Sequence, residues 1–388
     1  MKCKGRSTYH DIVFVLLIAV VLAGCAQQGQ STGTPTPAPL PTTALPDDGC
    51  GMDALDDCGG DVAPMPAYRA IPGVYLGRFH GTRVPSVDLD AEIGKGFAVY
   101  LQYVDWRAPF NAGMYRANAR VGRITHTTWE YKPGTTGVMA DYEGRPLEAV
   151  VDGVFDDHIR SWAAGAAEFG KPIFLRWGHE MNGNWYPWGG ANNGGGTLDG
   201  FGDPTKPDGP ERFVAAYRHI HDIFAEAGAD NVLWIWCPNA PFAAMEQAYG
   251  GNWNAVANYY PGDEYVDWLG FDGYNWGTSA YGQSFNSVWT SFDGIFAASY
   301  RELQALNAEK PMMIGEYAST EDGGNKAAWI TDAYTRIRED YPQIRAVMWF
   351  HINKETDWRI DSSPESLAAF KQAVSDDYWL EAWPGMRD

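Results

Sequence analysis

Two glutamates stand out because each follows directly on an apolar run. Glu180 comes shortly after the run IFLRW at 173–177, and Glu316 follows MMIG at 312–315. Burial in such a run penalises a charged carboxylate, so function is a common reason for its presence. A buried ion pair with a neighbouring arginine is the alternative explanation for either glutamate alone. Two glutamates in matched positions favour chemistry that needs a pair of carboxyl groups.

The chemistry that such a pair suits is double displacement at a sugar carbon, with retention of configuration, when the carboxyl groups lie about 5–5.5 Å apart. One carboxylate attacks the sugar carbon, and the other protonates the leaving oxygen and then deprotonates water. The two groups need different pKa values, which their surroundings must set. We expect a raised pKa for Glu180 as proton donor. We expect Glu316 to be held ionised by hydrogen bonds, with Tyr274 and His179 as the nearest candidate donors.

Other chemistries find no matching pattern. His179 and Glu180 do not form a zinc motif, because position 183 is glycine where a second histidine is required, and no CxxC pair is present. A GxSxG nucleophile elbow is also absent, so we predict no metal and no cofactor. The 29 basic and 49 acidic residues give a net charge of −20, which argues against nucleic acid and against a polybasic membrane patch.

The elements that must position these groups are eight apolar runs separated by stretches of helical periodicity. The candidate strands are 73–79, 96–106, 122–131, 172–181, 231–238, 266–274, 311–317 and 346–352. The clearest candidate helices are 147–169, 211–227, 287–307, 326–339 and 364–375. Apolar runs that alternate with helices are typical of a parallel sheet, and eight such units predict one (β/α)8 TIM barrel.

The barrel explains how glutamates far apart in the sequence could meet. Reacting groups stand at the carboxyl ends of barrel strands, and the fourth and seventh strands face one another across the mouth. Glu180 and Glu316 follow those two strands. A doubly wound sheet is the competing fold, but the segment LGRFHG at 76–81 lacks the glycine pattern of its phosphate-binding turn.

The aromatic content points to the class of ligand. Aromatic residues make up 14% of the chain, including 17 tryptophans, several of which fall at or just past the predicted strand ends. Their flat faces suit the apolar face of a pyranose ring, and an acidic, aromatic cleft suits a neutral polysaccharide. An aromatic-rich core accounts for some of them. We single out Trp185 and Trp349 as residues that contact sugar.

The segment RWGHEMNGNWYPW at 176–188 resembles the acid/base segment of glycoside hydrolase family 26, whose best-known members are endo-β-1,4-mannanases. GFDGYN at 270–275, IGEY at 314–317 and VMWF at 347–350 add to the resemblance, which covers roughly residues 70–380. It implies a retaining hydrolase with Glu180 as acid/base and Glu316 as nucleophile. It also implies that His179 and Tyr274 steady the nucleophile and its sugar, and that the subsites are lined by Arg176, Asn182, Trp185 and Trp349.

The resemblance leaves the substrate open. It favours an endo-acting enzyme on β-1,4-linked mannan, but the family also contains β-1,3-1,4-glucanases and β-1,3-xylanases. A carbohydrate-binding lipoprotein without catalysis is the alternative from another class. Such a binder would need neither glutamate.

The N-terminus predicts export. A basic start and an apolar stretch end in LAGC at 22–25, which resembles a bacterial lipobox, so we expect 1–24 to be a lipoprotein signal peptide and Cys25 to be lipidated. A plain signal peptide is the alternative. Residues 25–66, rich in Pro, Thr, Gly and Asp, predict a flexible linker, followed by a catalytic domain at 67–388. The membrane is then a partner only through the lipid anchor, at the cell surface or in the periplasm. Cys50 and Cys58 could pair there, and Cys237 is expected to be a buried free thiol.

Overall fold

The structure is a computed structural model that describes residues 71–81, 87–130 and 146–387. The predicted signal peptide and linker, with Cys25, Cys50 and Cys58, lie outside these residues. Within them, Cys237 is a buried free thiol, as predicted. Among the described helices, none has both the length and the apolar character that crossing a membrane requires.

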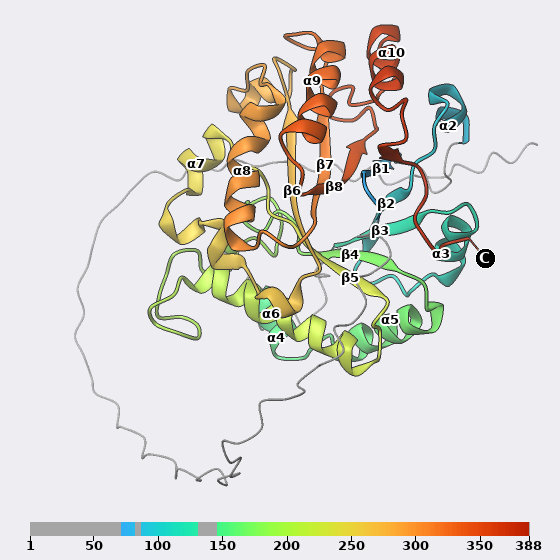
Figure 1. The fold of residues 1–388 in the computed structure, drawn as a ribbon. Coiled ribbons are helices and arrows are strands. Elements are labelled where there is room, and N and C mark those ends of the chain that lie inside the picture. The colour runs from blue at the N-terminus through green and yellow to red at the C-terminus, as the bar shows by residue number, and fades with distance from the viewer. Residues whose placement is uncertain (1–70, 82–86, 131–145, 388) are drawn as a thin grey trace, which may run out of the picture. The chain divides into compact units, whose positions relative to one another are not determined.

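Eight parallel strands form a closed barrel (Figure 1). They pair in the order β2 to β8 and then β1, and β1 closes the ring by pairing Gly77 with Val99 of β2. Each predicted strand overlaps an observed one, so the (β/α)8 barrel is confirmed. The strands are β1 (Val74–Phe79), β2 (Val99–Asp105), β3 (Ile124–Glu130), β4 (Ile173–Trp177), β5 (Val232–Trp236), β6 (Trp268–Asn275), β7 (Met312–Ser319) and β8 (Ile344–Phe350).

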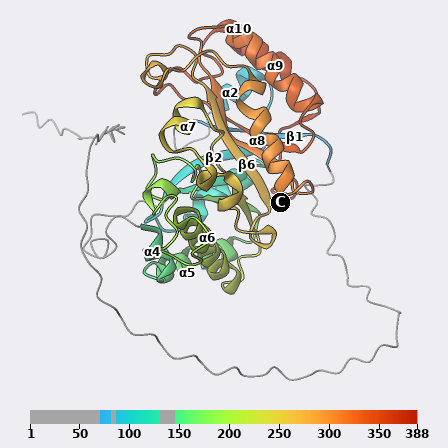
Figure 2. The same ribbon diagram turned by 90° about the vertical axis from the view of Figure 1, so that its left-hand side faces the viewer.

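Helices surround the strands. In both Figure 1 and Figure 2, α4 to α6 cover one side of the barrel and α8 to α10 another. The helices are α2 (Val87–Ile93), α3 (Ala112–Arg120), α4 (Pro146–Val151), α5 (Asp156–Phe169), α6 (Asp208–Glu226), α7 (Ala243–Tyr249), α8 (Phe292–Leu306), α9 (Lys326–Glu339) and α10 (Pro364–Ala373).

The helices follow the apolar periodicity of the sequence, with local differences at their ends. In α6, Phe213, Tyr217, Ile220 and Phe224 recur at helical spacing and are buried against the barrel. The predicted helix 147–169 is two helices, because the chain breaks at 152–155, where Gly153 has a φ of 76°. The predicted helix 287–307 begins later, at Phe292. The short helices α2, α3 and α7 were not predicted, since seven to nine residues carry too little periodicity.

The C-terminal segment closes the end of the barrel at which the strands begin. The Trp383 ring packs on Tyr75 and Phe174, with ring centroids 4.4 and 4.9 Å apart. A short strand, β9 (Trp379–Leu380), adds to β1 and leads the chain into this position. Apolar side chains fill this half of the interior. The polar residues of the interior therefore gather at the other end, where the strands finish.

Candidate active site

A buried charged network lies beneath the mouth of the barrel. Arg176 on β4, Asp272 on β6 and Glu316 on β7 are at most 5% exposed. Arg176 Nη1 donates to both carboxylate oxygens of Asp272, at 2.9 and 2.7 Å, and Nη2 donates to Glu316 Oε1. Arg176 Nε also donates to Thr128 Oγ1 at 3.0 Å. One arginine therefore orients two carboxylates from different strands.

The second oxygen of Glu316 is fixed as well. Tyr274 Oη donates to Glu316 Oε2 at 2.5 Å, and His179 Nε2 lies 4.0 Å from Oε1. Burial and the charge of Glu316 raise the pKa of the Tyr274 hydroxyl well above its usual range, so it remains a donor. Burial opposes the charge of Arg176, but the carboxylates of Asp272 and Glu316 outweigh it and raise the guanidinium pKa. Both groups therefore donate hydrogen bonds that orient the Glu316 carboxylate.

The position of Glu316 depends on an irregularity in β7. Phe271 of β6 pairs with Ile314, but the next residue, Asp272, pairs with Glu316, so Gly315 is an extra residue. A β-carbon at Gly315 would lie 2.6 Å from Asp272 Oδ1 and 2.7 Å from Arg176 Nη1, closer than real contacts allow. A bulge re-aims the following side chain. Here it directs Glu316 toward Tyr274.

Glu180 lies in a tight turn just beyond β4. Its backbone is left-handed, with a φ of 54°, which is rare for any residue but glycine. The backbone N–H of Glu180 donates to the carbonyl of Cys237 at 2.7 Å, and the Trp185 indole Nε1 donates to Glu180 Oε2 at 2.6 Å. These contacts stabilise a left-handed backbone conformation that is unfavourable for most residues other than glycine. Strained residues of this kind are concentrated at functional sites.

The surroundings of Glu180 favour the protonated form. Burial raises its pKa well above the usual range, and the negative charges of Asp272 and Glu316 raise it further. The Trp185 hydrogen bond and the charge of Arg176 act in the opposite direction without cancelling this rise. The two glutamates are therefore close enough to interact electrostatically, yet burial and negative neighbours favour the acid form of Glu180, whereas Glu316 accepts hydrogen bonds from a guanidinium and a hydroxyl. This pair can supply a proton donor and a nucleophile at one place.

The comparisons with known proteins agree with this geometry. Residues 124–320, about half of the chain and most of the barrel from β3 to β7, match the family model of glycosyl hydrolase family 26. The chain belongs to this family. Over 286 residues it is 39% identical to Endoglucanase H of Acetivibrio thermocellus, an alignment that covers 72% of this chain and 28% of that protein. Over 204 residues it is 28% identical to a mannan endo-1,4-beta-mannosidase of Bacillus subtilis, covering 52% of this chain and 44% of the other.

The barrel of this family 26 chain also resembles solved structures. The catalytic domain of a Bacillus sp. JAMB-750 GH26 endo-beta-1,4-mannanase superposes with a TM-score of 0.59 at 20% identity, and covers 81% of this chain and 89% of that one. At this level of identity the likeness supports the fold. The chain spans less than half the length of the two curated relatives.

Two residues predicted to line the subsites are too deep to do so. Arg176 is fully buried beneath Glu316, where it positions carboxylates. Asn182 is 1% exposed. Its Nδ2 donates to the Asn239 carbonyl and its Oδ1 accepts from the Asn239 backbone N–H, both at 2.8 Å, which connects the loops after β4 and β5. His179 is also buried, with Nε2 3.1 Å from the Tyr186 hydroxyl. The sequence shows that these residues are polar and close together in the chain, but it does not show how deeply each side chain is buried.

The prediction for Trp349 needs correction. Its side chain has no exposed surface, its indole Nε1 donates to the Trp358 carbonyl at 2.8 Å, and its ring packs on Tyr317 and Phe370 behind the barrel wall. A ring in this position cannot stack on sugar. The neighbouring residue, Phe350, has the opposite orientation, and its ring lies 5.6 Å from that of Tyr274.

Sequence reasoning missed the aromatic residues on the nucleophile side of the mouth. Burial and the charge of nearby Glu316 raise the pKa of the Tyr103 hydroxyl on β2, and Phe79 of β1 packs on both Tyr103 and Phe350, with ring centroids 4.9 Å from each. All three lie at or near the carboxyl ends of their strands. Phe79 and Phe350 come near the end of their apolar runs, but Trp106 follows Tyr103 in the predicted strand 96–106, and the inward face could not be chosen without the register.

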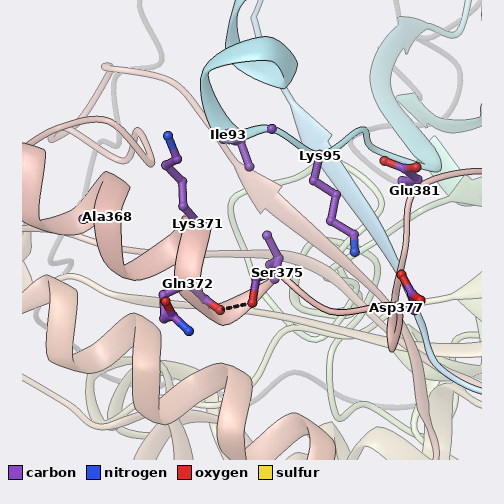
Figure 3. Close-up of a pocket in the computed structure, with 10 residues that line it drawn as sticks. Ile93, Lys95, Ala368, Lys371, Gln372, Ser375, Asp377 and Glu381 are labelled. Carbon is purple, nitrogen blue, oxygen red and sulfur yellow. Dashed lines mark hydrogen bonds between the residues drawn. The ribbon is translucent and has the colours of Figure 1, made fainter.

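A separate pocket of about 610 Å³ lies at the other end of the barrel (Figure 3). It is formed by the segment before β2 and by the chain around the end of α10. None of the predicted site residues lines it. Its lining includes Ile93, Lys95, Lys371, Ser375, Asp377 and Glu381.

Proposed function

We propose that this protein is a retaining, endo-acting glycoside hydrolase that cleaves β-1,4-linked mannan by double displacement. The observation that carries the proposal is the opposite treatment of two neighbouring glutamates. Glu316 accepts hydrogen bonds from Arg176 and Tyr274, whereas burial and nearby negative charge raise the pKa of Glu180. Membership of glycosyl hydrolase family 26 supports the reaction class.

The reaction then has two steps. In the first, a carboxylate oxygen of Glu316 forms a bond to the anomeric carbon while the glycosidic bond breaks, and the proton of Glu180 passes to the leaving oxygen. In the second, Glu180 takes a proton from water as the water oxygen attacks the same carbon and Glu316 leaves. Arg176 and Tyr274 keep the nucleophile in place through both steps. No cofactor enters the scheme.

Mannan is the first candidate substrate. One relative is a mannan endo-1,4-beta-mannosidase, and a GH26 endo-beta-1,4-mannanase has the same fold. The second candidate is mixed-linkage β-1,3-1,4-glucan. It is favoured by the 39% identity to Endoglucanase H, which extends over 72% of this chain. β-1,3-Xylan is the remaining candidate within the family.

The test is the release of reducing sugar from mannan, barley-type β-glucan and β-1,3-xylan by wild type and Glu316→Ala. We expect mannan to be hydrolysed fastest and the variant to be inactive on all three. Faster hydrolysis of barley glucan would replace mannan by the second candidate. Activity on none of them, together with retained binding, would favour the carbohydrate-binding lipoprotein.

We also propose that the protein is exported and anchored to a membrane through lipidated Cys25, on the basis of the sequence LAGC at 22–25. The experiment is incorporation of labelled palmitate during expression in a bacterium, followed by membrane fractionation. Label and membrane association should be lost in Cys25→Ser and kept in Cys50→Ser. Label that persists in Cys25→Ser would contradict the anchor.

A further inference from the structure

Aromatic side chains form a continuous arc along one half of the barrel mouth. It begins at Trp185, whose ring lies 6.2 Å from Phe242, and continues to Phe285 at 5.5 Å. Phe285 lies 5.4 Å from Trp276, and Trp276 lies 5.7 Å from Tyr274, where the arc ends. All distances are between ring centroids. The arc therefore runs from the loop after β4, through the loop after β5, to the end of β6 and the loop that follows it.

The two ends of the arc are bonded to the two catalytic glutamates. Trp185 donates to Glu180, and Tyr274 donates to Glu316. The arc is thus continuous with the reaction centre. The Tyr281 ring stacks on Trp276 at 5.1 Å, which extends the apolar surface in the loop after β6.

The rings of the arc are accessible, in contrast to most tryptophans of the chain. Phe242 is 37% exposed, and Trp185, Trp276 and Phe285 are half-buried. Trp177 and Trp236 are the last residues of the neighbouring strands β4 and β5 and have no exposed surface. Apolar rings that stay accessible and touch one another across three loops form a patch of the kind that marks a binding surface. Trp276 also packs on the buried Trp358, with ring centroids 4.7 Å apart, but core packing does not account for Trp185, Phe242 and Phe285.

The position of the arc relative to the two glutamates indicates which sugars of the substrate it would contact. Glu180 protonates the leaving oxygen, so the sugars on the leaving side extend past Glu180 and its partner Trp185. The other half of the mouth, with Phe79, Tyr103 and Phe350, adjoins Glu316 and faces the sugar that is attacked. Within the arc, Trp185 and its neighbour Phe242 lie on the side of Glu180, whereas Tyr274 at the other end contacts Glu316.

We propose that Phe242 and Phe285 extend the binding cleft on the leaving-group side, where together with Trp185 they stack on more than one sugar of the β-linked chain beyond the cleaved bond. This inference rests on the proposed function and deepens it, since an extended surface on that side lets the enzyme bind the middle of a polysaccharide. It therefore accounts for endo action.

The experiment compares two substrates in Phe242→Ala, Phe285→Ala and the double variant. One is the polysaccharide that wild type hydrolyses best, and the other is the β-glycosyl fluoride of its disaccharide, which has no sugar on the leaving side. We expect kcat/KM on the polysaccharide to fall about 10-fold for each ring, through KM, which corresponds to about 1.4 kcal/mol of lost binding free energy. Hydrolysis of the fluoride should stay within about 2-fold of wild type.

Controls separate binding from stability. Tyr378→Ala removes a half-buried ring next to β9, at the far end of the barrel, and should change neither activity. Thermal unfolding shows whether each variant is folded, and Phe→Leu at both positions keeps most of the apolar volume while removing the flat ring. The leucine variants should reproduce the loss on polysaccharide.

The outcomes distinguish the two proposals. Equal loss on polysaccharide and fluoride, or no loss on either, in folded variants would overturn the role of the arc while leaving the hydrolase intact. A wild type that hydrolyses neither substrate would overturn the proposed function itself. Loss confined to the polysaccharide would support both.

Discussion

The two sides of the barrel mouth place a glutamate side chain in opposite environments. On the β7 side, Glu316 is held by the Arg176 guanidinium and by the Tyr274 hydroxyl within a network that includes Asp272. On the β4 side, Glu180 sits in a left-handed turn with one indole donor, and burial is the largest influence on its pKa. One side supplies positive charge and fixed donors, whereas the other supplies burial and negative neighbours.

From this difference we infer different roles for two chemically identical residues. A carboxylate that accepts several charged or hydroxyl hydrogen bonds stays ionised and can attack, while one that is desolvated near other acids keeps its proton and can donate it. Charge on Glu316 also raises the pKa of Glu180, so the β7 side helps to keep the proton on the β4 side. Changes on either side should therefore have distinct and predictable effects.

The largest effect is expected when the β7 side loses its nucleophile. Glu316→Ala should lower kcat on polysaccharide by roughly 10⁴-fold or more, because no other carboxylate can form the bond to the anomeric carbon. Added azide should restore turnover of an activated aryl glycoside and give an α-glycosyl azide. A variant within about 10-fold of wild type would remove Glu316 from this role.

Loss of the proton donor on the β4 side should be smaller and depend on the leaving group. Glu180→Ala should lower kcat on polysaccharide by about 10²–10⁴-fold, the usual contribution of general acid catalysis. The first step with a 2,4-dinitrophenyl glycoside should be spared, since that leaving group needs no proton. Equal losses on both substrates in pre-steady-state measurements would contradict the assignment.

The support beneath Glu316 should show in stability. Asp272→Asn removes one carboxylate from the buried Arg176 and should lower the free energy of unfolding by about 3 kcal/mol or more. Asp376→Asn breaks an exposed ion pair with Arg338 and should cost less than about 1 kcal/mol. Urea unfolding measures both. If the Asp272 variant cost no more than the Asp376 variant, the ion pair would not hold the network.

The smallest effect concerns the pH profile on the β4 side. The Trp185 indole stabilises the charged form of Glu180, so Trp185→Phe should raise the Glu180 pKa. Activity requires protonated Glu180, and kcat/KM falls as pH rises through its pKa. The alkaline limb should therefore move to higher pH in Trp185→Phe and stay in place in Trp253→Phe. A limb that moved to lower pH would reverse the inferred sign.

Much of this site was predictable because strand ends were readable. Apolar runs indicated the eight strands, and parallel strands in a closed barrel bring their carboxyl ends together, so the proximity of Glu180 and Glu316 could be predicted without coordinates. The ion-pair explanation for a buried glutamate also proved relevant, since Glu316 is paired with Arg176. A salt bridge and a functional role coexist at that residue.

The parts that could not be predicted depend on which face of a strand points inward. Strands of a barrel are apolar on both faces, so the sequence of β8 does not tell whether Trp349 or Phe350 faces the mouth. The alternation of inward-facing and outward-facing side chains is interrupted at Gly315, because this extra residue shifts the register of β7. The depth of Arg176 and Asn182 was hidden for the same reason, because residue type alone does not give burial.

The most direct test of the account is to trap the intermediate on the enzyme. A 2-deoxy-2-fluoro glycoside with a dinitrophenyl leaving group, matched to the preferred polysaccharide, should inactivate the protein with a stoichiometry of one. Peptide mass spectrometry should then find the sugar on Glu316. Label on Glu180 or another residue, or hydrolysis with inversion and no adduct, would contradict the assignment of Glu316 as the nucleophile opposite Glu180.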